Sequence, residues 1–164
     1  MHWTVYLSGE IHTNWRDIIE AQSATAELPV SFTYPVTDHA ASDDCGVEIM
    51  GSEASKFWHD HKGAKLNAIR TRTYLEQADI VVVRFGDKYK QWNAAFDAGY
   101  AAALGKPLII MHGPDHQHAL KEIDGAASVL LSCHYPGRKV RCSGRGYSRY
   151  QCGKHGIGDS QGCR

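Results

Sequence analysis

Three acidic side chains stand where a parallel α/β sheet would bring them together. Glu10 directly follows the first apolar segment of the chain, Asp43 (or its neighbour Asp44) lies in a polar loop over 37–44 after the second, and Asp97 stands on an Ala-rich segment after the third. Loops and helices that follow parallel strands meet in the crevice beyond the carboxyl ends of the strands, where such sheets bind ligands. Carboxylates in different environments can divide the roles of nucleophile and general acid or base. Each acid also fits a plainer interpretation, as a solvated loop or helix residue.

Further side chains close to these acids in the sequence could bind a substrate. Asn93 stands four residues before Asp97, so the two share a helical face. Arg84 ends the third apolar segment, where it fits either a bidentate bond to a phosphate or a structural salt bridge. Trp92 and Tyr89 fit either stacking on a base or packing in the core or at the surface. The spacing alone leaves these alternatives open.

The elements that must position these residues alternate between strand and helix. A short apolar, β-branched segment such as Ile80-Val81-Val82-Val83 is typical of a strand buried in a parallel sheet. Strands are predicted over 3–7, 29–34, 79–85, 108–111 and 128–132, helices near 14–26, 64–77 and 91–104, a short helix near 117–123 and a helix or turn near 48–51. This alternation predicts a flavodoxin-like α/β fold: a doubly wound, mainly parallel five-stranded sheet with helices on both faces, followed by an irregular C-terminal tail.

The helix near 91–104 should lie close to the sheet. Trp92, Phe96 and Tyr100 recur every four residues and predict one apolar face, and the remaining positions are mostly Ala. Gly105 is placed to end the helix, and Pro107 cannot continue it.

Charge divides the chain in two. Residues 135–164 hold seven Lys or Arg and one acid, a net charge of +6, whereas residues 1–134 hold 11 bases and 17 acids, a net charge of −6. We therefore expect an α/β domain over 1–134 and a basic, Gly-, Arg- and Cys-rich tail over 135–164 that is irregular or disordered. The chain shows no signal-peptide pattern and no membrane-spanning run, which favours the cytoplasm and no membrane partner.

Several other classes of site have no good signature. The histidine pairs His59-x-His61 and His116-x-His118 lack matched metal-ligand spacing, so we expect no metal site. The cysteines of the tail are likewise too far apart for a zinc motif. No dinucleotide, P-loop or nucleophile-elbow motif is present, so we expect no cofactor. The basic tail suits only nonspecific contact with nucleic acid.

Three runs of residues carry a family resemblance. They are 4–16 (TVYLSGEIHTNWR), 48–51 (EIMG) and 85–93 (FGDKYKQWN), supported by DAGYA at 97–101 and LGKP at 104–107. In this order they resemble the nucleoside 2-deoxyribosyltransferase superfamily and, within it, the YtoQ family. The resemblance covers roughly residues 3–125 and does not extend into the tail.

The resemblance implies retaining transfer at an N-glycosidic bond. In the transferases a carboxylate attacks C1′ of a deoxynucleoside, the base leaves, and a second base or water attacks the deoxyribosyl-enzyme, which is the logic of a retaining glycosidase. Asp97 stands where the transferases have a Glu. Because Asp has one methylene group fewer, its carboxylate lies about 1.5 Å closer to the backbone. Gln91 stands where they have an acid, six positions earlier.

The implied site has two catalytic carboxylates and a surrounding set of binding residues. Asp97 and Glu10 are the catalytic candidates, and the substrate-binding candidates are Tyr6, Ser8, Gly9, Asp43, Arg84, Gly86, Asp87, Trp92 and Asn93. The expected substrate is a small-molecule nucleoside or nucleotide, processed by a transferase or a hydrolase. The alternative is a noncatalytic nucleotide-sensing module that kept the pocket and lost the chemistry. The resemblance also implies a homo-oligomer.

Overall fold

The computed structural model describes residues 1–88 and 91–132, without the side chains of His39 and Ser132. The predicted basic tail, its cysteines and Tyr89 lie outside the described residues. No helix within the described ranges has the length and apolarity that crossing a membrane requires.

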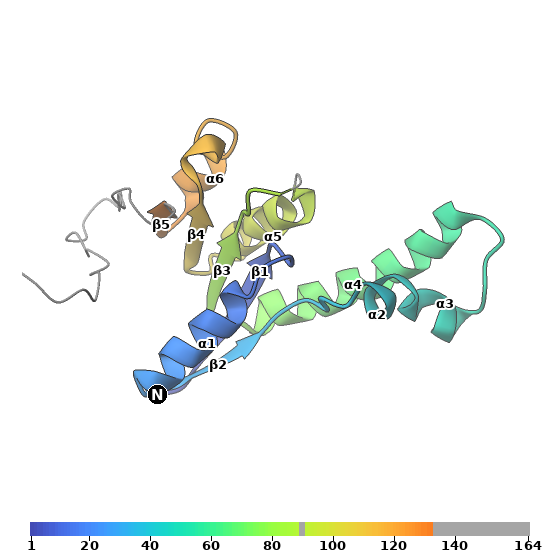
Figure 1. Cartoon of the computed structure of the whole chain (residues 1–164), viewed down its shortest axis with the longest axis horizontal. Helices are drawn as coiled ribbons and strands as arrows, with labels where there is room; N and C mark the ends of the chain where they lie inside the picture. Colours follow the sequence, from blue (N-terminus) through green and yellow to red (C-terminus); the bar gives the residue numbers. More distant parts are fainter. Residues whose placement is uncertain (89–90, 133–164) are drawn as a thin grey trace, which may run out of the picture.

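Five parallel strands form one sheet (Figure 1). They are β1 (Trp3–Gly9), β2 (Val30–Thr33), β3 (Ile80–Arg84), β4 (Leu108–His112) and β5 (Val129–Ser132), in the order β2-β1-β3-β4-β5. The direction of winding reverses between β1 and β3, and this switch point is where doubly wound sheets bind ligands. The predicted flavodoxin-like fold is confirmed, and all five predicted strands are present.

Helices cover both faces of the sheet. On one face, Trp15 of α1 (Trp15–Thr25) packs with Leu7 and Val82. On the other face, α4 (Lys56–Gln77) and α5 (Trp92–Ala103) pack against the sheet. They do so through small or branched side chains such as Leu75 and Ala98. A 3-10 turn (Pro114–His116) and α6 (Lys121–Ala126) lead from β4 into β5.

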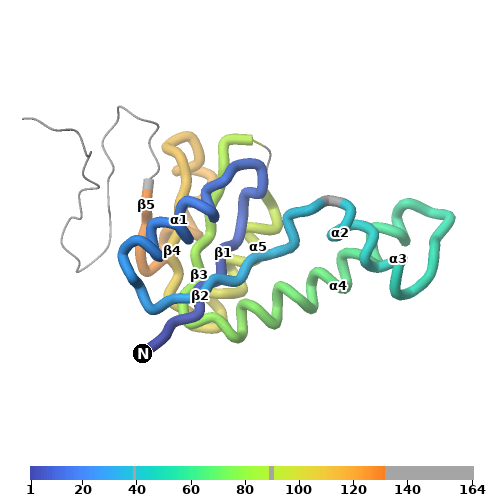
Figure 2. The backbone as a smooth tube through the Cα atoms, turned by 60° about the horizontal axis from the view of Figure 1, so that its bottom comes forward, coloured from blue at the N-terminus to red at the C-terminus, as the bar shows by residue number. Residues whose placement is uncertain are grey.

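An arm, which we define as residues 39–70, projects from the sheet (Figures 1 and 2). It contains α2 (His39–Asp43), α3 (Cys45–Met50) and the larger part of α4. Two glycines let the helices of the arm pack tightly: a Cβ on Gly46 would lie 2.3 Å from the backbone nitrogen of Gly63, and a Cβ on Gly63 would lie 2.7 Å from the carbonyl oxygen of Asp43.

The prediction missed the extent of this arm. Residues 37–44 were expected as a loop, but α2 forms there, with the Asp38 carboxylate accepting a hydrogen bond from the backbone N–H of Ala41. Helix α4 begins at Lys56 rather than near Ala64, so the histidine pair at 59–61 lies inside a helix.

The predicted apolar face of α5 is also wrong. Trp92 and Phe96 are each 72% exposed, and the buried residues of the helix are Ala94, Asp97, Ala98 and Ala101. Small side chains on the inner face of α5 let the helix backbone approach the sheet closely. Large aromatic rings would not fit on that face, so they lie on the outer side of the helix. The end of the helix is as predicted: Gly105 has a φ of +68° and continues into a Schellman turn, in which Lys106 N–H donates to the carbonyl of Ala101.

Candidate active site

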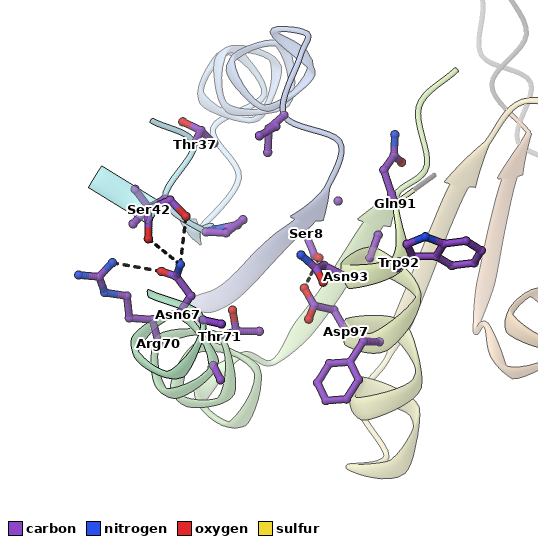
Figure 3. Close-up of a pocket in the computed structure, with 18 of the residues that line it drawn as sticks. Ser8, Thr37, Ser42, Asn67, Arg70, Thr71, Gln91, Trp92, Asn93 and Asp97 are labelled. Atoms are coloured by element: carbon purple, nitrogen blue, oxygen red, sulfur yellow. Dashed lines mark hydrogen bonds between the residues drawn. The ribbon is translucent and has the colours of Figure 1, made fainter. Parts of the chain in front are cut away.

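A cavity of about 1040 Å³ opens at the carboxyl end of β1, between that strand, α5 and the arm (Figure 3). Its lining includes Ser8, Gly9 and Glu10 from the end of β1, and Asn93 and Asp97 from α5. We call Ser8, Glu10 and Asp97 the sheet wall of the cavity. Ser42, Asn67 and Arg70, which line the opposite side, form its helical wall.

Asp97 is the buried carboxylate of the sheet wall. It is 7% exposed, and the hydroxyl of Ser8, itself 1% exposed, donates a 2.5 Å hydrogen bond to its Oδ2. Burial raises the pKa of Asp97 from 3.8 to about 6, although the Ser8 hydrogen bond acts in the opposite direction. Ser8 engages one carboxylate oxygen, and among the described residues no hydrogen bond is present on the other. Asp97 is thus a buried carboxylate with one oxygen held by Ser8.

Glu10 is the second buried carboxylate, at 3% exposure. The backbone N–H of His12 donates to one of its oxygens, and the Thr13 hydroxyl donates to the other at 2.6 Å. Arg84 Nε lies 3.8 Å from that same oxygen. Gly86 allows this position, because a Cβ there would lie 2.3 Å from the Cγ of Glu10. The Glu10 carboxylate is therefore fixed by its surroundings.

The turn that carries these residues is held by Arg16, which the sequence analysis did not single out. Arg16 is 6% exposed and donates to the carbonyl oxygens of Leu7, Gly9 and Glu10 at 3.1, 3.2 and 2.8 Å. The indole N–H of Trp15 also donates to the Glu10 carbonyl, at 2.7 Å. Burial lowers the pKa of the Arg16 guanidinium, and the charge of Glu10 acts against this.

Gly9 makes the end of β1 possible. Its φ is +105°, and a Cβ at this position would lie 2.0 Å from the carbonyl oxygen of Arg84 on β3. Only glycine fits this conformation and this close approach.

The helical wall was not predicted. Asn67 donates to the carbonyl and the hydroxyl of Ser42, both at 3.0 Å, and accepts a 3.3 Å bond from Arg70. In Figure 3 these side chains lie across the cavity from Ser8 and Asp97. Gly63, Asn67 and Arg70 are spaced at four and three residues, so the period of a longer α4 would have placed them on one face.

The remaining predicted binding residues divide into two groups. Asp43, Trp92 and Asn93 line the cavity together with Ser8 and Gly9, whereas Tyr6, Arg84, Gly86 and Asp87 do not. Tyr6 lies in the core, with its ring centroid 5.9 Å from that of Tyr74. Burial and the nearby Asp97 charge raise the pKa of Tyr6. Its hydroxyl is near Thr71 but makes no hydrogen bond of normal geometry within the described residues.

Gln91, which stands at the acidic position of the transferases, has a structural contact as well as a place in the lining. Its side-chain oxygen accepts a 2.8 Å bond from the Gly86 N–H, and its side-chain nitrogen donates to the Lys88 carbonyl at 2.8 Å. The amide thus closes the turn between β3 and α5.

Two of the described histidines pair with acids. His59 Nε2 lies 3.1 Å from Asp44, and the buried His112 lies 3.1 Å from Asp124. Within residues 1–88 and 91–132, no three His, Cys, Asp or Glu side chains gather as metal ligands would.

Fold and site together define the class: a doubly wound α/β protein with a carboxylate-lined cavity at the switch point of its sheet. Residues 6–135 match the family described as nucleoside 2-deoxyribosyltransferase YtoQ, and the chain belongs to this family. It is 44% identical over 131 residues to the uncharacterized protein YtoQ of Bacillus subtilis (strain 168), covering 80% of this chain and 88% of that protein.

Two solved structures are similar in fold at low sequence identity. A conserved protein from Enterococcus faecalis V583 aligns with a TM-score of 0.50 and 14% identity, over 79% of this chain and 82% of that one. A 2-deoxyribosyltransferase from Bacillus psychrosaccharolyticus aligns with a TM-score of 0.49 and 17% identity, over 79% and 86%. The first of these agrees with the fold described above.

Proposed function

We propose that this protein is an enzyme acting at the N-glycosidic bond of a nucleoside or nucleotide, with Asp97 as the nucleophile. The observation that carries the proposal is the setting of Asp97: a buried carboxylate, bonded to Ser8, at the wall of a large cavity. Membership of the nucleoside 2-deoxyribosyltransferase YtoQ family supports the same reaction class.

The first step is displacement of the base. The free oxygen of the Asp97 carboxylate attacks C1′ of the sugar, the bond from C1′ to the base nitrogen breaks, and the base leaves with the electron pair and takes up a proton from the bulk solvent. A covalent glycosyl ester of Asp97 results. Ser8 holds the other oxygen, which fixes the plane of the carboxylate relative to the cavity.

The second step regenerates the carboxylate. A second base, or water, attacks C1′ and breaks the ester, so that two inversions give overall retention. The acceptor decides between transferase and hydrolase. Glu10, the second carboxylate of the sheet wall, is the candidate partner for the sugar or for the proton that moves in each step.

An aromatic rim offers a place for the departing and incoming bases. Trp92 and Phe96 line the cavity and remain largely exposed. Base-on-aromatic stacking tolerates different bases because every base has a π-face, which suits an enzyme that exchanges one base for another.

The test is a chromatographic assay of purified protein with a panel of 2′-deoxynucleosides and their 5′-monophosphates, with and without excess free base. Wild type should produce a new nucleoside when a second base is present, or free base alone if it is a hydrolase. Asp97→Ala should lower turnover by at least about 1,000-fold, because it removes the nucleophile.

Asp115→Ala is the matched control, since it makes the same substitution at an exposed aspartate that lies outside the cavity lining and outside the predicted binding set. It should keep wild-type turnover. Turnover that survives Asp97→Ala contradicts the role of Asp97. Absence of turnover across the panel, together with nucleotide binding in calorimetry, favours the noncatalytic sensor instead.

We also propose that the protein is a cytoplasmic homo-oligomer. The arm supports the second point, because Ile49, Phe57 and Trp58 are 71%, 65% and 53% exposed on it. Light scattering coupled to size exclusion at micromolar concentration should give a mass above the 18.2 kDa of one chain; a monomer would contradict the proposal.

A further inference from the structure

The carboxylate of Asp97 has a polar neighbour one helical turn away. Asn93 lies four residues before it on α5, and the Cβ atoms of two residues at this spacing are about 5–6 Å apart on one face of a helix. Both side chains line the cavity, and in Figure 3 both project from α5 towards the end of β1. A ligand that reaches Asp97 therefore meets Asn93 as well.

Asn93 differs from the other polar side chains near Asp97 in that its hydrogen-bonding groups are not engaged. The Ser8 hydroxyl already donates to Asp97, and both carboxylate oxygens of Glu10 already accept from the β1–α1 turn. Asn93 is exposed, and within residues 1–88 and 91–132 its side chain makes no hydrogen bond. Its amide thus offers a carbonyl acceptor and an NH₂ donor to a ligand.

The stereochemistry of the proposed reaction decides which part of the sugar meets this amide. In a β-nucleoside the base lies on one face of the sugar ring, and a nucleophile displaces it from the opposite face. The 2′-hydroxyl of a ribose projects from that opposite face, on the carbon next to C1′, whereas a 2′-deoxyribose has only hydrogen there. A 2′-hydroxyl therefore lies beside the attacking carboxylate and needs a hydrogen-bond partner next to it.

The length of the nucleophile acts in the same direction. Because Asp97 has one methylene group fewer than a glutamate, the sugar must lie about 1.5 Å closer to α5 for C1′ to come within reach of the carboxylate. The face of the sugar that carries a 2′-hydroxyl then also lies closer to the preceding turn of the helix, where Asn93 stands.

We propose that Asn93 binds the 2′-hydroxyl of a ribosyl substrate, so that the cavity accepts ribonucleosides as well as 2′-deoxyribonucleosides. The amide exchanges a hydrogen bond with the hydroxyl, and no proton is transferred between them. The bond from C1′ to the base breaks and the ester to Asp97 forms as for a deoxynucleoside. The inference rests on the proposed function and widens its substrate class to ribosides.

The experiment is an internal competition. Each of the four common ribonucleosides is placed in one vessel with an equal amount of its 2′-deoxy counterpart, and chromatography follows the loss of both, which gives the ratio of their kcat/KM values. The electron-withdrawing 2′-hydroxyl slows departure of the base, but a hydrogen bond to it strengthens in the transition state. Wild type should therefore process at least one ribonucleoside within about tenfold of its 2′-deoxy counterpart.

Asn93→Leu keeps a side chain of similar size and removes both the donor and the acceptor. It should lower kcat/KM for the ribonucleoside, relative to the deoxynucleoside, by at least about tenfold, because the 2′-hydroxyl then has no partner. The ratio comes from a single vessel, so any loss of folded protein affects both substrates equally.

Asn67→Leu is the matched control, because it makes the same substitution at a second asparagine of the cavity, on the helical wall across from Asp97. It should change the ratio by less than about twofold. An equal shift with both substitutions would assign the effect to the general polarity of the cavity and overturn the role of Asn93. A wild type that consumes only the deoxynucleosides overturns the inference and leaves the proposed function intact.

Calorimetric affinities of wild type and Asn93→Leu for the same nucleosides separate the remaining cases. If no nucleoside is turned over, the proposed reaction fails, and tighter binding of a ribonucleoside that is lost in Asn93→Leu still supports the contact. Equal affinities for the two sugars in wild type, or no binding of either at millimolar concentration, overturn it.

Discussion

The two walls of the cavity are built in different ways. The sheet wall consists of buried side chains, with Ser8, Glu10 and Asp97 between 1% and 7% exposed. The helical wall is carried by the arm, which leaves Ile49, Phe57 and Trp58 largely in solvent. In the proposed reaction the sheet wall carries the groups that must meet the reacting atom, and such groups need a packed setting. The helical wall would only enclose the substrate, which does not require such packing.

This difference suggests that substitutions can affect the reaction and the enclosure of the substrate separately. A change in the sheet wall should affect the stability of the whole domain and the reaction together. A change in the arm should alter a local element and leave the sheet folded.

The largest effect is expected at Gly9. Substitution by Ala combines a φ of +105° with a Cβ placed 2.0 Å from the Arg84 carbonyl oxygen, so two strands must separate. We expect Gly9→Ala to lower the free energy of unfolding by at least about 3 kcal/mol. Denaturant unfolding followed by circular dichroism measures it.

Gly99→Ala is the control for that substitution. Gly99 lies within α5, and no atom lies within 4 Å of its added Cβ. It should raise stability by about 0.5–1 kcal/mol, because Ala is the better helix former. If the two substitutions have similar effects, the end of β1 is not the close contact described here.

The second effect concerns the charge of Asp97. Its pKa is about 6 in the folded protein and 3.8 when unperturbed, so folding favours the protonated form. The stability that comes from this preference is present below pH 4 and is lost as the pH rises through 6. At pH 7, Asp97→Asn should therefore be more stable than wild type by up to about 3 kcal/mol.

The difference should shrink to less than about 1 kcal/mol at pH 4, where Asp97 is protonated when folded. Thermal melting of both proteins from pH 4 to 7 measures it. The same ionisation should make turnover rise with pH through about 6, since only the carboxylate is a nucleophile. A stability gap that does not depend on pH would show that Asp97 is not the group responsible.

The smallest effect is expected in the arm, at Gly46. A Cβ there would meet the backbone of Lys62 and Gly63 on α4, so Gly46→Ala should loosen α3 by about 1–3 kcal/mol. Hydrogen exchange should quicken for amides of α3 but not for those of β3. Gly125→Ala in α6, with open space around its Cβ, is the control. Faster exchange in both α3 and β3 would mean that arm and sheet unfold as one unit.

The contrast between the walls also explains what the sequence could predict. The central strand β3 was predictable because both of its faces are covered, which leaves the β-branched run of Ile80–Arg84. The first turns of α4 were not, because helix residues such as Phe57 and Trp58 project into solvent and produce no amphipathic period. Secondary structure was therefore predicted best for the segments that are packed most tightly.

The same reasoning applies to the site. The position of Asp97 was predictable from its place after β3, but the packed face of α5 was not, because Trp92 and Phe96 suggested burial by size. The sheet selects Ala94, Ala98 and Ala101 instead, since close approach of a helix depends on small side chains rather than on hydrophobicity alone. Arg16 gave no pattern at all, because its partners are backbone carbonyls, which every residue type supplies.

Arg16 has a consequence for redesign of the protein. It binds the β1–α1 turn through the carbonyl oxygens of Leu7, Gly9 and Glu10, so these three contacts do not depend on the side chains at positions 8 and 10. Combinatorial exchange at positions 8 and 10 would keep these contacts, but it would remove the buried hydrogen bonds of Ser8 or Glu10 and should lower the stability of the domain. A laboratory seeking altered donor preference would randomise these two positions and leave Arg16 untouched.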